Sequence, residues 1–235
     1  MKSDAFFVIT DYNHLSQDLS ESWIPKYTKN YLIYDKSGRW EENENIKTQI
    51  NVGQSVYDMF DYILNNYDNL PEMVCFVKGD VIPRHCGEEK FSKIIHNKEY
   101  TPIENYSRGL SQYTDGAYSF VDENDNYHEN SSEVNYTVGS IHHGKYFNSY
   151  QSFLGEIFEN PKFSQYIKFP PGGCHLIPRE NILRFNKTFY EDARLWVSWD
   201  VRPGEAFLFE RAGTTLFTCD WIIKDKYLNK ETHSI

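Results

Sequence analysis

Acidic residues follow three short apolar runs in the N-terminal half of the chain. They are Asp11 after 5–10, Asp35 after 31–34 and Asp80 after 73–77. Such runs are typical of buried parallel strands, and ligands of an open α/β sheet bind beyond the carboxyl ends of its strands. Carboxylates gathered there could bind a divalent cation or hydrogen-bond the hydroxyls of a ribose. The alternative is that each of them simply forms the turn after its strand.

A helix is predicted between the second and third runs. Its apolar positions keep the spacing of one buried helical face: Val56, Met59, Phe60, Ile63, Leu64 and Tyr67. We expect Asn51 to cap its N-terminus, with Gln54 as the capping-box partner, and Pro71 to stop it. Strand, helix and strand joined by short turns predict an α/β fold with a Rossmann-type mixed sheet flanked by helices.

The rest of the chain divides into three parts. Residues 105–148 are rich in Tyr, Ser, Asn, Asp and Gly, which predicts a long irregular surface insertion containing a hairpin. Residues 149–223 carry helical periods after Ser149, Pro178, Asn186 and Pro203, with one short strand at 174–177. Residues 224–235 form a polar tail that we expect to be frayed. The chain is thus predicted to be a single domain.

Charge and composition exclude several classes of function. The chain has 235 residues, with 24 Lys and Arg against 34 Asp and Glu, a net charge of −10. A chain of this charge lacks the basic footprint of a nucleic-acid or anionic-membrane binder. It has no apolar stretch of about 18 residues, so no transmembrane segment is expected. Its four scattered cysteines fit free thiols of a cytoplasmic protein.

One block of the sequence resembles a known family. The segment INVGQSVYDMFDYILNNYDNLPEMVCFVKGD, residues 50–80, resembles a poorly characterised glycosyltransferase-like family of viruses, bacteria and fungi. The shared pattern is N-x-G, a helix, N-Y-x-x-L-P, and an apolar strand closing on Gly and a polar residue. Weaker similarity covers 5–23 with 31–36, and 171–200 with 203–211, whereas the insertion has no counterpart.

The resemblance implies a GT-A type fold with a nucleotide-sugar half, residues 1–104, and an acceptor half, residues 149–223. It implies that the following residues lie beside the nucleotide: Thr10, Asp11, Tyr12, Asp35, Asn51 and Gly53. Lys78 and Arg211 are further candidates for nucleotide contacts, Arg211 for a phosphate. Arg211 could instead form a structural ion pair with Glu210. The preferred nucleotide is UDP, because Asp35 corresponds to the position that meets the base or ribose.

The resemblance also implies a metal ion at Asp80, where such enzymes carry a D-x-D motif. Here only the last acidic residue is present, after Lys78 and Gly79. Mn²⁺ or Mg²⁺ would therefore need a further ligand, for which His85 is the candidate. The acidic loop 122–125 is a weaker alternative, because no apolar strand precedes it.

The chemistry of glycosyl transfer suggests roles for residues in the C-terminal half. The departing diphosphate must be neutralised by a metal or by Lys and Arg, and an inverting enzyme needs a carboxylate to accept the proton of the acceptor hydroxyl. The resemblance implies Glu191 and Asp192 for that carboxylate, although acidic residues near a helix N-terminus are also stabilised by the helix dipole. His175 and Trp199 are the candidates for acceptor contacts.

The sequence therefore predicts an inverting hexosyl- or deoxyhexosyltransferase of polysaccharide biosynthesis. It would move a sugar from a nucleoside diphosphate, UDP by preference, to a hydroxyl of a glycan or glycolipid. Three alternatives stay open: a carbohydrate-binding protein without turnover, a glycoside hydrolase with paired carboxylates, and a transferase relative that binds nucleotide without reacting.

Overall fold

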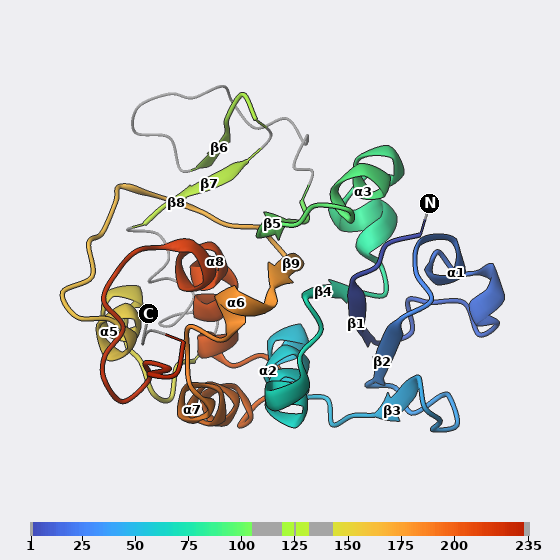
Figure 1. The fold of residues 1–235 in the computed structure, drawn as a ribbon, viewed down its shortest axis with the longest axis horizontal. Coiled ribbons are helices and arrows are strands. Elements are labelled where there is room, and N and C mark those ends of the chain that lie inside the picture. Colours follow the sequence, from blue (N-terminus) through green and yellow to red (C-terminus); the bar gives the residue numbers. More distant parts are fainter. Residues whose placement is uncertain (1, 105–118, 125, 132–142, 233–235) are drawn as a thin grey trace.

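The computed structural model describes residues 2–104, 119–124, 126–131 and 143–232. A six-stranded sheet with the order β3-β2-β1-β4-β9-β5 runs through the fold (Figure 1). Its strands are β1 (Phe6–Asp11), β2 (Tyr31–Asp35), β3 (Ile46–Thr48), β4 (Met73–Lys78), β5 (Thr101–Pro102) and β9 (His175–Pro178). β1, β2, β3 and β4 run parallel to one another, whereas β9 is antiparallel to both β4 and β5. The predicted α/β class with a mixed, mostly parallel sheet is confirmed.

Helices cover both faces of the sheet because its central strands are apolar on both sides. Phe7 and Ile9 of β1 face one core, which includes residues of α1 (Ile24–Tyr27) and α3 (Glu88–Ile94). Val8 faces the other core, with α2 (Gln54–Asn66), α7 (Lys187–Val197) and α8 (Gly204–Thr218). Burial on both faces explains why these strands are continuous apolar runs in the sequence.

The predicted helix between the second and third strands is α2, but its first residues differ from the expectation. Asn51 does not cap it; the N-cap is Gly53, whose φ is +58° and which offers no side chain. A Cβ on Gly53 would lie 2.6 Å from the carbonyl oxygen of Val197, so only glycine fits between the helices. Gln54 also has a left-handed φ, +53°. The helix gives way to the 3₁₀ turn η2 (Tyr67–Asn69).

The predicted C-terminal helices are confirmed. Ser149 caps α5 (Tyr150–Ile157) through a reciprocal pair of hydrogen bonds with Ser152. Pro178 precedes the short helix α6 (Arg179–Ile182), and the Asn186 side chain caps α7. Two further short turns, η1 (Leu19–Glu21) and η3 (Val81–His85), follow β1 and β4.

Part of the predicted insertion forms a second, antiparallel sheet. The predicted hairpin is present as β6 (Ser119–Val121) and β7 (Tyr127–Asn130), and β8 (Tyr166–Lys168) adds a third strand that the sequence did not indicate. The small sheet lies beside the β5 end of the large sheet (Figure 1). Most of the insertion, 105–118 and 132–142, lies outside the described residues.

The tail is not frayed where the structure describes it. Tyr227 is fully buried, and the backbone amide of Lys224 donates to the carbonyl of Ile157 at 3.0 Å. The prediction of a frayed tail from 224 is therefore wrong up to residue 232, because one aromatic side chain anchors a polar segment. All four cysteines are free, as predicted. Within the described ranges, no helix combines the length and apolar character needed to cross a bilayer.

Candidate functional site

The order in which the chain adds strands to the sheet reverses at β1, and a pocket lies at this point. From β1 the chain builds β2 and β3 on one side and then returns to form β4 on the other. Crevices at such a switch point are where open α/β sheets bind ligands. The pocket has a volume of about 620 Å³. Its described lining residues are Thr10, Tyr12, His14, Lys36, Asn51, Gln54, Ser55, Lys78, Asp80, Arg84, Val201, Arg202 and Phe207.

Positively charged side chains gather in this pocket although the chain has a net charge of −10. Lys78 lies at the end of β4, Arg84 in η3, and Arg202 in the loop between α7 and α8. Among the described residues, the side chains of Lys78 and Arg202 have no hydrogen-bond or ion-pair partner. Unpaired cations at a concave site favour an anionic ligand.

The loop that carries Arg202 is fixed against the start of α2. The backbone amide of Gly53 donates to the carbonyl of Asp200 at 2.9 Å. The amide of Arg202 donates to Oδ1 of the same aspartate at 2.8 Å. A side chain at Gly53 would collide with Val197 at the end of α7, directly before this loop, so the glycine positions the pocket without lining it.

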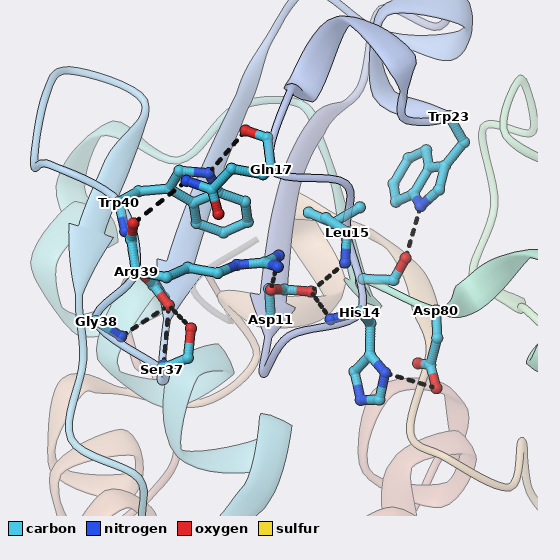
Figure 2. Close-up of polar contacts among 12 residues, drawn as sticks. Asp11, His14, Leu15, Gln17, Trp23, Ser37, Gly38, Arg39, Trp40 and Asp80 are labelled. Carbon is cyan, nitrogen blue, oxygen red and sulfur yellow. Dashed lines mark hydrogen bonds and ion pairs between the residues drawn. The ribbon is translucent and has the colours of Figure 1, made fainter.

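Asp80 is the one carboxylate among the described lining residues of the pocket. Its Oδ2 accepts a hydrogen bond from Arg84 at 2.8 Å and lies 3.9 Å from Nδ1 of His14, the pair drawn in Figure 2. Burial opposes its ionisation, but the hydrogen bond from Arg84 and the nearby imidazoles outweigh this and lower the pKa of Asp80. The Asp80 side chain is therefore an anion at neutral pH.

His85 and Glu104 lie behind Asp80. Nε2 of His85 is 4.0 Å from Oδ1 of Asp80, and its Nδ1 is 3.6 Å from Oε2 of Glu104. Three of these atoms are buried and have no hydrogen-bond partner within the described structure: Nε2 of His85, Oδ1 of Asp80 and Oε2 of Glu104. Burial raises the pKa of Glu104, and His85 partly offsets this effect. A Cβ on Gly172, whose φ is +97°, would collide with the imidazole of His85. The absence of a side chain at residue 172 therefore makes room for His85.

The donor set around Asp80 does not fit the metal site that the resemblance implied. In the described part of the chain, no three His, Cys, Asp or Glu side chains are arranged to hold a metal ion. Asp80 and His85 are brought close together as predicted, but they are two donors, and Arg84 already occupies one oxygen of Asp80. Mg²⁺ and Mn²⁺ prefer several oxygen ligands.

A buried ion pair fixes the floor of the pocket. Nζ of Lys36 lies 3.3 Å from Oδ1 of Asp58 and donates to the carbonyls of Val52, at 2.7 Å, and Gln54. The Thr10 hydroxyl donates to Oδ2 of Asp58 at 2.6 Å. Burial raises the pKa of Asp58 to about 7, against the opposing effect of the Lys36 ammonium. The pair joins β1, β2 and α2, and it holds the left-handed backbone at the start of α2.

Asp11 and Asp35 lie side by side in the β1–β2 register, but their carboxylates bind loop groups. Oδ1 of Asp11 accepts from the amides of His14 and Leu15, and its Oδ2 pairs with Arg39 at 2.7 Å (Figure 2). The Asp35 carboxylate accepts hydrogen bonds from the Ser37 hydroxyl and from the backbone amides of Gly38 and Trp40. Turn formation thus accounts for both carboxylates, and neither is among the lining residues.

Several other predicted site residues have partners away from the pocket. Arg211 forms a bidentate pair with Glu129 of β7, at 2.6 and 3.2 Å. His175 is buried, and its Nδ1 lies 2.8 Å from the Tyr100 hydroxyl. Trp199 donates from Nε1 to Glu205 at 3.2 Å.

The predicted acid pair of α7 also lies outside the pocket lining. Asp192 accepts a hydrogen bond from the Tyr227 hydroxyl at 2.9 Å, and its neighbour Glu191 is exposed. The sequence-predicted residues that do line the pocket are Thr10, Tyr12, Asn51, Lys78 and Asp80.

Sequence reasoning missed Lys36, His14, Arg84 and Arg202. Lys36 and His14 stand within three residues of a strand end, so a wider search around each strand end would have included them. Arg84 follows Asp80 by four residues, a common ion-pair spacing. No local signal marks Arg202, which reaches the pocket only because the α7–α8 loop docks on α2.

The fold and pocket define an α/β protein with a ligand site at the switch point of its sheet. The chain belongs to the family described as "Protein of unknown function (DUF3431)", whose model matches residues 10–218. Comparison with curated proteins and with solved structures finds no match.

Proposed function

We propose that this protein is a glycosyltransferase that uses a nucleoside diphosphate sugar, with UDP-sugars as the first donors to test. The observation that carries the proposal is the pocket between the ends of β1 and β4, with unpaired Lys78 and Arg202 at its wall. The acceptor in this proposal is a hydroxyl of a glycan or glycolipid.

The other lining groups are compatible with a nucleotide. Tyr12, which is 52% exposed, offers a ring face for stacking of a base. Asn51, Gln54 and Ser55 at the start of α2 offer polar groups to a ribose or a phosphate. The N-terminus of this 13-residue helix adds a favourable field for negative charge.

The reaction has two demands that the pocket's charges could meet. As the bond between the anomeric carbon and the diphosphate oxygen breaks, negative charge grows on the leaving group, and fixed cations stabilise it. The acceptor hydroxyl must lose its proton as it attacks. Asp80, ionised beside Arg84, is the carboxylate that we assign to this proton in place of Glu191 and Asp192.

Two of the alternative functions, the hydrolase and the carbohydrate-binding protein, have less support. A glycoside hydrolase needs two carboxylates flanking the scissile bond, and the described lining of the pocket supplies one. A protein that binds a neutral carbohydrate without turnover has no need for cations. The positive character of the pocket therefore favours a phosphate-bearing ligand.

The test is release of nucleoside diphosphate from a panel of UDP-, GDP- and dTDP-sugars by the full-length protein, alone and with mixed glycan and glycolipid acceptors. We expect one donor class to be consumed, faster with acceptor, and Lys78→Met to slow it about tenfold or more, the scale of one lost charge-assisted contact. Lys187→Met, at an exposed lysine of α7 paired with Asp68, is the matched control and should keep full activity. Absence of turnover with every donor would contradict the proposal.

A further inference from the structure

We propose that side chains replace a divalent cation at the diphosphate of the ligand: Lys78, Arg84 and Arg202 neutralise it, and Asp80 orients Arg84. The identity of the ligand as a nucleoside diphosphate rests on the proposed function. The binding of a diphosphate without metal is a separate property of the pocket and can be measured without turnover.

The Asp80 carboxylate is already paired with a cation. Arg84 donates to its Oδ2 at 2.8 Å, so the negative charge at the usual position of a metal ligand is already matched by a guanidinium. The side chain of Arg84 is 63% exposed and is among the described lining residues of the pocket. A guanidinium held in this way presents a planar set of donors that suits phosphate oxygens.

Cationic side chains outnumber anionic ones among the described lining residues. Three cationic side chains, Lys78, Arg84 and Arg202, face one anionic group, Asp80; the ammonium of Lys36 is matched by buried Asp58. Lys78 also repels Lys36, which a bound anion would relieve. A divalent cation added to this set would increase the repulsion, whereas a diphosphate lowers it.

Two buried side chains, His85 and Glu104, lie behind Asp80. His85 and Glu104 form a buried row with it, at 4.0 and 3.6 Å, and the absence of a side chain at Gly172 makes room for the imidazole in this row. His85 is absent from the described lining of the pocket. We assign it as a positioning residue that keeps Asp80, and through it Arg84, in place.

The experiment is calorimetric binding of UDP and of inorganic pyrophosphate to the full-length protein, in EDTA and in excess Mg²⁺ or Mn²⁺. We expect both ligands to bind in EDTA. Lys78→Met and Arg202→Met should each weaken binding about tenfold or more, Lys78→Arg should restore most of it, and Lys187→Met should change nothing.

Asp80→Asn separates the two roles of the carboxylate. If Asp80 were a metal ligand, Asp80→Asn would remove that ligand. Binding of UDP and pyrophosphate would then weaken and would no longer depend on the metal. A carboxylate that orients Arg84 without ligating a metal leaves diphosphate binding in EDTA unchanged or tighter when its charge is removed, and this is the result that we expect. The proton-accepting role proposed above for Asp80 does not enter a binding measurement. Binding that appears only with Mg²⁺ or Mn²⁺ and is abolished in Asp80→Asn would overturn the inference.

The remaining outcomes distinguish this inference from the proposed function. Pyrophosphate binding in EDTA that depends on Lys78, without sugar release from any donor, supports the metal-free site and counts against the transferase. Donor turnover that requires a metal supports the transferase and counts against the metal-free site. No binding of either ligand under any condition contradicts both.

Discussion

Oδ1 of Asp11 occupies the space that a side chain on Gly79 would need. Asp11 is fully buried and held by two backbone amides and Arg39, so it cannot move aside cheaply. The contact joins the end of β1 to the end of β4 across the switch point. It also explains why a glycine stands next to Asp80.

Gly79→Ala is therefore expected to destabilise the protein by about 1–3 kcal/mol, the usual cost of overpacking. Denaturant unfolding measures the change. Gly155→Ala is the control, because this glycine lies within α5 with open space around its Cα, and alanine there should raise stability by about 0.5–1 kcal/mol. Equal stability of Gly79→Ala and the wild type would show that Asp11 is not fixed as described.

The Arg211–Glu129 pair is expected to tie the small sheet to α8. Both side chains are buried, so Arg211→Met removes the guanidinium that faces the Glu129 carboxylate and should cost about 3–5 kcal/mol. The double variant Arg211→Met/Glu129→Met should recover much of that loss. A single variant as stable as the wild type would argue against a buried pair and would reopen a ligand role for Arg211.

His175 should make stability depend on pH. Burial lowers the pKa of His175 from 6.5 to about 3, so between these values the unfolded chain binds a proton that the folded chain does not. The free energy of unfolding is therefore unaffected by protonation of His175 above pH 6.5 and decreases as the pH falls from 6.5 toward 3, with a slope of up to about 1.4 kcal/mol per pH unit.

Unfolding of His175→Gln across this range measures the contribution, because glutamine does not titrate. The variant should be less sensitive to acid than the wild type, whatever its absolute stability. His96→Gln is the control, since the His96 side chain is exposed and stays in water in both states. Parallel pH profiles for wild type and His175→Gln would contradict the assignment.

Tyr227 should anchor the C-terminal tail. Tyr227→Ala removes a fully buried ring and should cost about 3–5 kcal/mol. Tyr227→Phe keeps the ring but removes the hydroxyl that donates to Asp192 at 2.9 Å and, more weakly, to Glu156 at 3.5 Å, and it should cost about 1 kcal/mol. Ile222→Ala, at a side chain that is 72% exposed, should stay within about 0.5 kcal/mol of wild type. Limited proteolysis of Tyr227→Ala would report release of the tail.

The sequence alone determined the elements that build the site. Apolar runs marked β1, β2 and β4, and a helical period marked α2, because burial imposes these patterns on neighbouring residues. A ligand of such a sheet binds at the carboxyl ends of the strands. The residues at and just after these ends include Thr10, Tyr12, Lys78 and Asp80, all of which line the pocket.

Only the tertiary structure decided which charges face that pocket. Asp11 and Asp35 share its edge of the sheet, yet both bind loop groups. Arg211, a predicted nucleotide contact, pairs instead with Glu129, which lies 82 residues earlier in the chain. Arg202 enters the pocket through a loop that docks on Gly53. The direction of a charged side chain depends on its partners in space, and those partners come from segments whose distance along the chain carries no local pattern.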